Sequence, residues 1–139
     1  MQELKTYFID SNVFLRFLVQ DDAKAFESCV AFFKKIEQGR VKIVISPLVF
    51  AEIVWVLKSY YKFKKEKIIQ ALRAILLLKN LSVQDKSDPL KAIELFENNA
   101  IKFIDCLIAS DKNLQTQQYA LISYDRDFDA LGVIREEPS

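Results

Sequence analysis

The sequence predicts an α/β fold, with helices on both faces of a central, mostly parallel sheet, so that one domain of residues 1–139 contains three α/β/α layers. Short apolar runs of strand length alternate with longer stretches in which apolar residues recur every three or four positions. Only two glycines are present, and no glycine- or proline-rich linker divides the chain. Strands that alternate with helices in this way form parallel sheets with both faces buried.

The first strand and the two helices after it are predicted from the first 39 residues. Residues 7–9 form a short apolar run that is typical of a buried strand. Residues 13–18 place four apolar side chains on one helical face, and residues 25–36 repeat this pattern. Gly39 then ends the second helix, because glycine readily adopts the left-handed conformation that follows many helices.

The middle of the chain repeats the order of strand and helix. Residues 41–45 are short and mostly β-branched, which predicts a second strand. Ser46 can cap a helix and Pro47 suits its first position, so we expect a helix over residues 47–60. Residues 65–79 are predicted to form another helix. The remaining elements are a short strand, two helices, a closing strand and a helical turn, at residues 82–84, 89–98, 101–110, 120–123 and 126–131.

Composition excludes several classes of enzyme. The chain has no histidine, which removes Ser-His and Cys-His catalysis and nearly every zinc enzyme site. Cys29 and Cys106 are far apart in apolar surroundings and are expected to be buried free thiols. No apolar stretch approaches the roughly 18 residues of a membrane span, and Glu3 and Lys5 make the N-terminus unlike a signal peptide. We therefore expect a cytoplasmic protein without a membrane partner.

Charge is unevenly distributed along a chain that is nearly neutral overall. Residues 34–79 include eleven basic and three acidic residues, so the net charge of this segment is 11 − 3 = +8. A basic middle within a neutral chain favours an anionic partner.

Two acidic residues directly follow predicted strands. Asp10 comes after the first strand, and Asp125 comes two residues after Ser123 at the end of the closing strand. Because the carboxyl ends of parallel strands meet at one edge of a sheet, both carboxylates are expected at the edge where ligands bind.

Two further acids lie on apolar helical faces. The positions three and four residues from Glu52 are all apolar, and most of those around Asp105 are apolar as well. Inward acids are costly unless they are paired or bound to a cation. Each acid taken alone could be hydrogen-bonded locally, with Asp10 capping a helix and Asp125 holding a turn. Taken together, four such acids without histidine or thiolate suit a hard cation such as Mg²⁺ or Mn²⁺.

Four segments carry these acids, and in this order they resemble the PIN-domain family, most closely its VapC-type toxin ribonucleases from toxin–antitoxin systems. The segments are FIDSN at 8–12, SPLVFAEIVWVL at 46–57, KFIDCLIAS at 102–110 and LISYDRDFDALG at 121–132. The resemblance covers nearly the whole chain and implies a PIN-like fold. Some PIN proteins have lost acids and activity, whereas this chain retains all four.

The resemblance implies metal-dependent hydrolysis of RNA phosphodiester bonds. It assigns four acids as catalytic residues and metal ligands: Asp10, Glu52, Asp105 and Asp125. Asp127 is a candidate helper, whereas Asp129 is expected to be a solvated helix residue. Asn12 and Ser123 are expected to orient the carboxylates, although ordinary cap and turn chemistry explains them equally well.

The expected partners are RNA, a protein antitoxin and a second copy of the chain in a homodimer, the last two implied by the resemblance alone. Residues 58–67 (KSYYKFKKEK) interleave lysines with aromatic residues and could contact RNA phosphates and bases. A solvated helix end, with its aromatic residues in the core, is the slightly favoured interpretation of this run. Trp55 could serve a dimer.

Two other functions remain open. The chain could be a non-catalytic module that binds RNA or a protein partner, or a DNA-directed or structure-specific nuclease of another PIN branch. The absence of additional domains favours the toxin branch, and a neighbouring gene for a DNA-binding antitoxin would distinguish it.

Overall fold

Five short strands form one sheet in the computed structural model, which describes residues 3–139. They are β1 (Thr6–Ile9), β2 (Lys42–Ile45), β3 (Leu81–Val83), β4 (Ala120–Ile122) and β5 (Arg135–Glu136). Their order is β3-β2-β1-β4-β5, and every neighbouring pair is parallel, so the sheet is entirely rather than mostly parallel. The central strand is β1, whose carboxyl end lies between those of β2 and β4.

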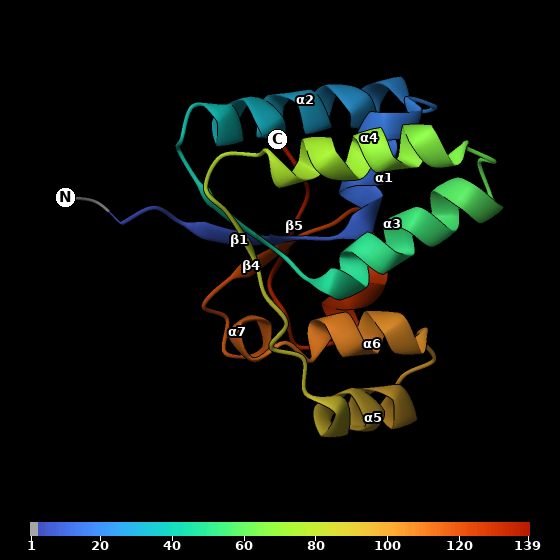
Figure 1. Ribbon diagram of the computed structural model, residues 1–139. Helices are drawn as coiled ribbons and strands as arrows, with labels where there is room; N and C mark the ends of the chain where they lie inside the picture. The colour runs from blue at the N-terminus through green and yellow to red at the C-terminus, as the bar shows by residue number, and fades with distance from the viewer. Residues whose placement is uncertain (1–2) are drawn as a thin grey trace.

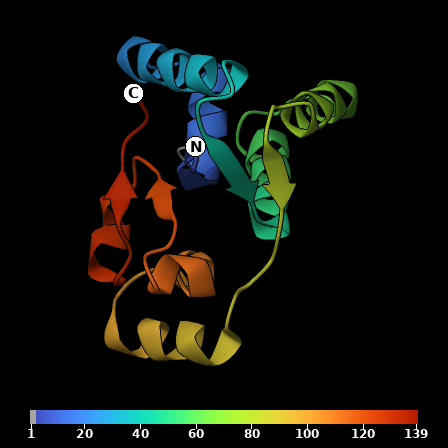
Figure 2. The same ribbon diagram turned by 90° about the vertical axis from the view of Figure 1, so that its left-hand side faces the viewer.

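Seven α-helices and one 3₁₀ helix connect the strands within residues 3–139. They are α1 (Ser11–Val19), α2 (Ala23–Glu37), α3 (Pro47–Ser59), α4 (Lys65–Leu76), α5 (Pro89–Asn98), α6 (Phe103–Ala109), α7 (Lys112–Gln115) and η1 (Arg126–Ala130). In Figure 1, α2 and α4 lie above the sheet and α5, α6 and α7 lie below it. Figure 2 shows the same separation after a quarter turn. The predicted three-layer α/β/α architecture is confirmed.

The predicted helix signals act as expected. Ser46 accepts a hydrogen bond from the backbone N–H of Leu48 at 3.1 Å, and Pro47 occupies the first position of α3. Asp88 caps α5 in the same way, with Pro89 at its first position. Gly39 has φ +70° just after α2, a conformation that a side chain would strain.

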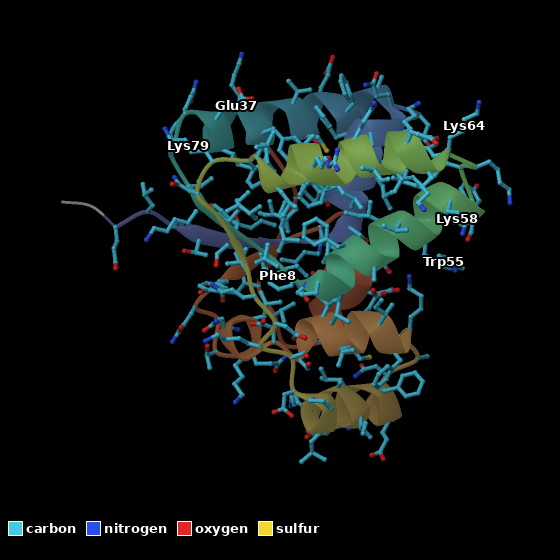
Figure 3. All side chains as sticks on the ribbon, viewed as in Figure 1. Phe8, Glu37, Trp55, Lys58, Lys64 and Lys79 are labelled. Atoms are coloured by element: carbon cyan, nitrogen blue, oxygen red, sulfur yellow. The ribbon has the colours of Figure 1, made fainter. Side chains whose placement is uncertain are left out.

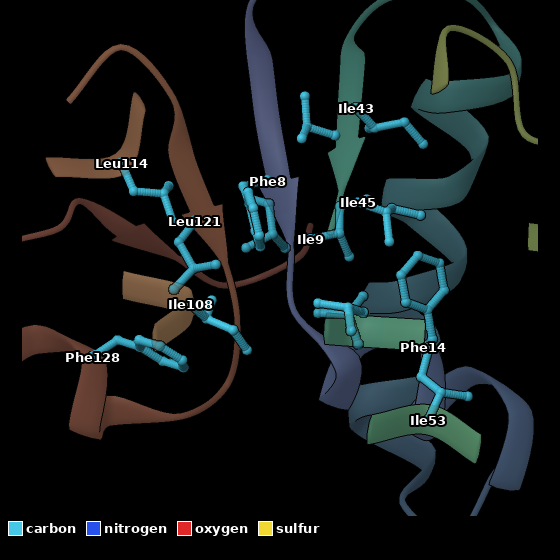
Figure 4. Close-up of a cluster of buried hydrophobic side chains, with 14 of the residues drawn as sticks. Phe8, Ile9, Phe14, Ile43, Ile45, Ile53, Ile108, Leu114, Leu121 and Phe128 are labelled. Carbon is cyan, nitrogen blue, oxygen red and sulfur yellow. The ribbon is translucent and has the colours of Figure 1, made fainter. Parts of the chain in front are cut away.

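The core extends over both sides of β1. Figure 4 shows Ile108, Leu114, Leu121 and Phe128 on one side of that strand, with Ile43, Ile45 and Ile53 on the other. All seven are essentially buried, as are Phe8 and Ile9 of β1 itself. Burial of each such side chain contributes about 1.5–3 kcal/mol to folding, so the sheet is a firm support for residues at its edge.

Two small elements were not predicted from the sequence, and two apolar side chains are exposed where the pattern predicts burial. α7 has four residues and β5 has two, too few to display a period. Val30 of α2 and Trp55 of α3 are exposed although both belong to predicted apolar faces. Among the described residues, no helix combines the length and hydropathy needed to cross a bilayer.

Candidate functional site

Asp10 is the first residue after β1, and the sheet fixes its position. Its backbone N–H donates to the carbonyl of Ile122 at 3.0 Å, which extends the pairing of β1 and β4 by one residue. Its side chain caps α1, because Oδ1 accepts from the N–H of Ser11 at 2.8 Å. The residue is only 3% exposed. Asp10 therefore lies at the expected edge of the sheet and also makes the local cap that was the alternative explanation for this acid.

Ser123 and Asn12 tie Asp10 to the loop after β4. The Ser123 hydroxyl donates to Oδ2 of Asp10 at 2.8 Å and accepts from the backbone N–H of Asp125 at 3.0 Å. The Asn12 amide donates to the same Asp10 oxygen at 3.1 Å and to the Ser123 hydroxyl at 3.0 Å. Its carbonyl oxygen accepts from the N–H of Tyr124 at 3.2 Å. Such a network fixes the orientation of the Asp10 carboxylate.

Glu52 reaches the same region from α3. Val49 and Ile53 beside it are buried and hold that face of the helix against the core. The Glu52 carboxylate is half-buried and accepts a hydrogen bond from the Ser11 hydroxyl. Ser11 thus contacts two acids at once, through its N–H to Asp10 and its hydroxyl to Glu52.

Asp105 projects from the first turn of α6 and is 3% exposed. Its Oδ2 atom is buried and has no hydrogen-bond partner, and the nearest cation to it is Lys102, with Nζ at 3.7 Å. A buried carboxylate oxygen without a partner carries a desolvation cost. Among the described acids, this oxygen is therefore the clearest candidate to accept a further ligand.

Asp105, Asp125 and Asp127 form a compact cluster in which one carboxylate oxygen of each lies within 4.8 Å of the other two. Asp125 caps η1, since its Oδ1 accepts from the N–H of Asp127 at 2.9 Å. The structure thus brings the candidate helper Asp127 beside two of the four predicted acids. Asp129 points elsewhere, because Arg135 binds both of its oxygens, at 2.8 and 3.3 Å.

Electrostatics couple this cluster to Asp10 and Glu52. Burial raises the pKa of Asp10 from 3.8 to about 7, the Ser123 hydrogen bond opposes this, and the charges of Glu52 and Asp105 add to it. Burial likewise raises the pKa of Asp105 to about 6, against the attraction of Lys102, while Asp125, Glu52 and Asp127 raise it further. The charges of Glu52 and Asp105 on Asp10, and of Asp125, Glu52 and Asp127 on Asp105, link the cluster to the two other predicted acids.

The donor set fits a divalent cation. It offers carboxylate oxygens without nitrogen or sulfur, which is the ligand chemistry of Mg²⁺ and Mn²⁺. A cation there would give Oδ2 of Asp105 a partner and offset the repulsion that adds to the effect of burial on the pKa of Asp10 and Asp105.

Sequence reasoning gave no role to Ser11 or Lys102. Ser11 directly follows Asp10, but its contact with Glu52, 41 residues away, follows only from packing. Lys102 lies three residues before Asp105, so its proximity to that acid is a local feature of the sequence. The expectation for the thiols is confirmed, because Cys29 and Cys106 are both free and buried.

The basic run after α3 has two faces. Its four lysines between residues 62 and 67 are exposed, whereas Tyr61 and Phe63 are half-buried against the core. The Tyr61 hydroxyl donates to Asp21 at 3.3 Å, and the Lys67 ammonium lies 4.3 Å from the centre of the Phe63 ring. Tyr60 alone among the three aromatic residues is largely exposed.

Known proteins resemble this chain over almost its whole length. The PIN domain family model matches residues 7–134. A VapC ribonuclease from Aquifex aeolicus (strain VF5) is 28% identical over 127 residues, which are 89% of this chain and 90% of that protein.

Three crystal structures share the fold. VapBC2 from Rickettsia felis, bound to a DNA fragment from its promoter, has a TM-score of 0.67 at 21% identity and covers 96% of this chain and 99% of its own. PAE2754 from Pyrobaculum aerophilum has a TM-score of 0.63 at 14% identity, and the match covers 95% of this chain and 89% of that protein. VapC20 from Mycobacterium tuberculosis, a sarcin-ricin loop cleaving toxin, has a TM-score of 0.64 at 18% identity. The match covers 92% of this chain and 96% of that protein.

Proposed function

The chain belongs to the PIN-domain family, and on this premise we propose that it is a divalent-metal-dependent endoribonuclease, the toxin of a VapBC-type toxin–antitoxin pair. The observation that carries the proposal is the cluster of Asp105, Asp125 and Asp127, in which one buried oxygen of Asp105 is unpartnered. The charges of Asp10 and Glu52, which Ser11 holds together, are coupled to this cluster. The similarity to a VapC ribonuclease of nearly equal length supports the choice of RNA as substrate.

In this proposal Asp10, Glu52, Asp105 and Asp125 hold Mg²⁺ or Mn²⁺ directly or through water, and Asp127 assists from the rim. When bound, the cation supplies an activated water and relieves negative charge on the phosphate. Ser123 and Asn12 each donate a hydrogen bond to Oδ2 of Asp10, and the Asn12 amide also donates to the Ser123 hydroxyl, so together they hold the orientation of the Asp10 carboxylate. The exposed ammonium of Lys102 offers a positive charge to an incoming phosphate next to Asp105.

The partners are part of the proposal. A protein antitoxin is proposed because VapBC2, which shares this fold, is a complex of that kind. The expected homodimer remains a prediction. One surface that could serve it is α5, where Leu90, Ile93 and Phe96 are exposed at helical spacing.

The decisive experiment incubates the purified chain with total cellular RNA, with and without Mg²⁺ or Mn²⁺, and maps the new ends. We expect cleavage only with metal. Four isosteric changes should each reduce it severely: Asp10→Asn, Glu52→Gln, Asp105→Asn and Asp125→Asn. Paired changes should cost little more than single ones, because groups that act as a unit are not additive.

Asp127→Asn and Asp129→Asn form a matched pair for this assay. The first removes a member of the acidic cluster and should lower the rate, whereas the second removes only the partner of Arg135 and should be nearly neutral. RNA binding without cleavage under any metal would favour the non-catalytic module, and cleavage of DNA alone would favour another PIN branch. Either result would overturn the proposal.

A further inference from the structure

Trp55 is the only tryptophan in the chain, and it lies on the outer surface of α3 with 67% of its area exposed. An exposed tryptophan leaves a large apolar surface in water. The fold does not use it, since the neighbours Ile53 and Leu57 supply the buried face of this helix. Its position relative to the acids suggests what covers it.

Trp55 lies one helical turn from Glu52, one of the predicted acids. Trp55 is three residues after Glu52 and four after Ala51, so both are its neighbours on the helix surface. Side chains on a helix lean toward its N-terminus and cover the preceding turn, which directs the indole toward Glu52. Ala51 is exposed and too small to cover the ring. In the view of Figure 3, Trp55 leaves α3 on the side where α6 lies.

Positive charge flanks the indole and the acids. Lys58 is exposed one turn beyond Trp55, and Figure 3 places both toward the same end of α3. The Lys102 side chain is 68% exposed, and its Nζ atom lies 3.7 Å from Oδ2 of Asp105. Exposed aromatic rings and nearby cations together bind single-stranded nucleic acid, through stacking on bases and attraction of phosphates.

On α3 itself, the exposed residues around Trp55 fit a base better than the core of a protein interface. Within α3, which the structure describes throughout, the other exposed residues are small or polar: Pro47, Ala51, Lys58 and Ser59. The core of a protein interface instead groups several large apolar side chains. Tyr60 follows five residues later, which places it about 140° around the helix from Trp55.

We propose that Trp55 is a stacking platform for an unpaired RNA base, which positions the adjoining phosphate at the acidic site while Lys58 contacts the backbone. The inference rests on the proposed ribonuclease function and deepens it by naming a residue that selects unpaired RNA. A base within a duplex already stacks on both faces, so only an unpaired base has a face free for the indole.

The single tryptophan provides the test. Its emission is recorded during titration with a short unstructured oligoribonucleotide and with the same sequence as a duplex, in Ca²⁺ to limit cleavage. Fluorescence anisotropy of a labelled oligonucleotide reports binding independently. We expect the single strand to quench the emission with the same Kd that anisotropy gives, and the duplex to quench it less. Trp55→Leu should weaken single-strand binding by roughly tenfold or more, and Trp55→Phe by less.

A matched control moves the single tryptophan to another surface of the protein. Leu77 lies at the end of α4, just before β3 and therefore at the opposite edge of the sheet, and it is strongly exposed. In Trp55→Leu with Leu77→Trp, the new indole should not respond to RNA.

Three results would overturn the inference while leaving the nuclease proposal intact: RNA binding without a change in emission, Trp55→Leu binding as tightly as wild type, or emission that shifts with protein concentration in the absence of RNA. The last result would mean that a second copy covers Trp55. A wild-type chain that neither binds nor cleaves any RNA would instead overturn both proposals.

Discussion

The hydroxyl of Ser11 donates a hydrogen bond to the carboxylate of Glu52, although 41 residues separate the two in the chain. Through its backbone N–H, Ser11 also donates to Asp10 at 2.8 Å. One small buried residue therefore sets the spacing between the acid after β1 and the acid of α3.

Removal of this hydroxyl should loosen Glu52. Ser11→Ala is expected to lower the free energy of unfolding by about 1 kcal/mol, as for one lost hydrogen bond, and to slow RNA cleavage by roughly tenfold, as for a mispositioned ligand. Ser11→Thr restores the hydroxyl and should restore most of the rate. Single-turnover cleavage at several Mn²⁺ concentrations measures this. An unchanged rate and metal dependence in Ser11→Ala would show that Glu52 needs no positioning.

The pH dependence of stability should reveal the buried Asp10. Because its folded pKa is raised from 3.8 to about 7, the folded state holds this proton more tightly than the unfolded state. Its stabilising contribution is complete below about pH 4 and is lost as the pH rises through about 7. The total effect is at most about 4 kcal/mol, since each pKa unit corresponds to about 1.4 kcal/mol.

Urea unfolding of the metal-free protein between pH 4 and pH 8 tests this. Asp10→Asn should flatten the decline and be about 1 kcal/mol more stable than wild type at pH 8, because it removes the buried charge. Part of the decline should persist, since the pKa of Asp105 is also raised. Asp129→Asn serves as the control and should keep the wild-type profile. An identical profile for wild type and Asp10→Asn would contradict the assignment.

Divalent metal should stabilise the folded chain by mass action. At a concentration 100 times the Kd, the gain is about 2.7 kcal/mol, which a thermal melt detects easily. Asp105→Asn should remove most of the gain, because it alters the carboxylate whose buried oxygen has no other partner. Asp129→Asn should retain the gain. A wild-type melting temperature that does not change in millimolar Mg²⁺ or Mn²⁺ would count heavily against a metal site.

The basic run after α3 should contribute to RNA affinity through charge. Replacing its four exposed lysines with glutamine should weaken binding and reduce the salt slope by about 0.7 per lost phosphate contact on a single strand. These are Lys62, Lys64, Lys65 and Lys67.

The control for that experiment changes Lys34, Lys42 and Lys79 instead. These lysines are also exposed but lie toward the opposite edge of the sheet, and Figure 3 shows Lys79 far from Lys64. If the two sets weaken binding equally, the basic run is only a solvated surface.

Local patterns were sufficient for four of the five strands and for the edge where the acids meet. The apolar run before Asp10 and the signal of Ser46 followed by Pro47 act within a few residues, so the sequence alone predicts a strand and a helix there. Since strands that alternate with helices become parallel, the placement of Asp10 and Asp125 at one edge follows from chain order.

Only the tertiary structure decided which side chains meet. The sequence separated Asp127 from Asp129 only through a resemblance, whereas in the structure the two-residue strand β5 brings Arg135 to Asp129 and leaves Asp127 beside Asp105. The exposure of Trp55 likewise depends on what packs against α3. Periodicity determines which residues share a face of a helix, but contacts between distant segments determine what that face meets, and no local pattern encodes them.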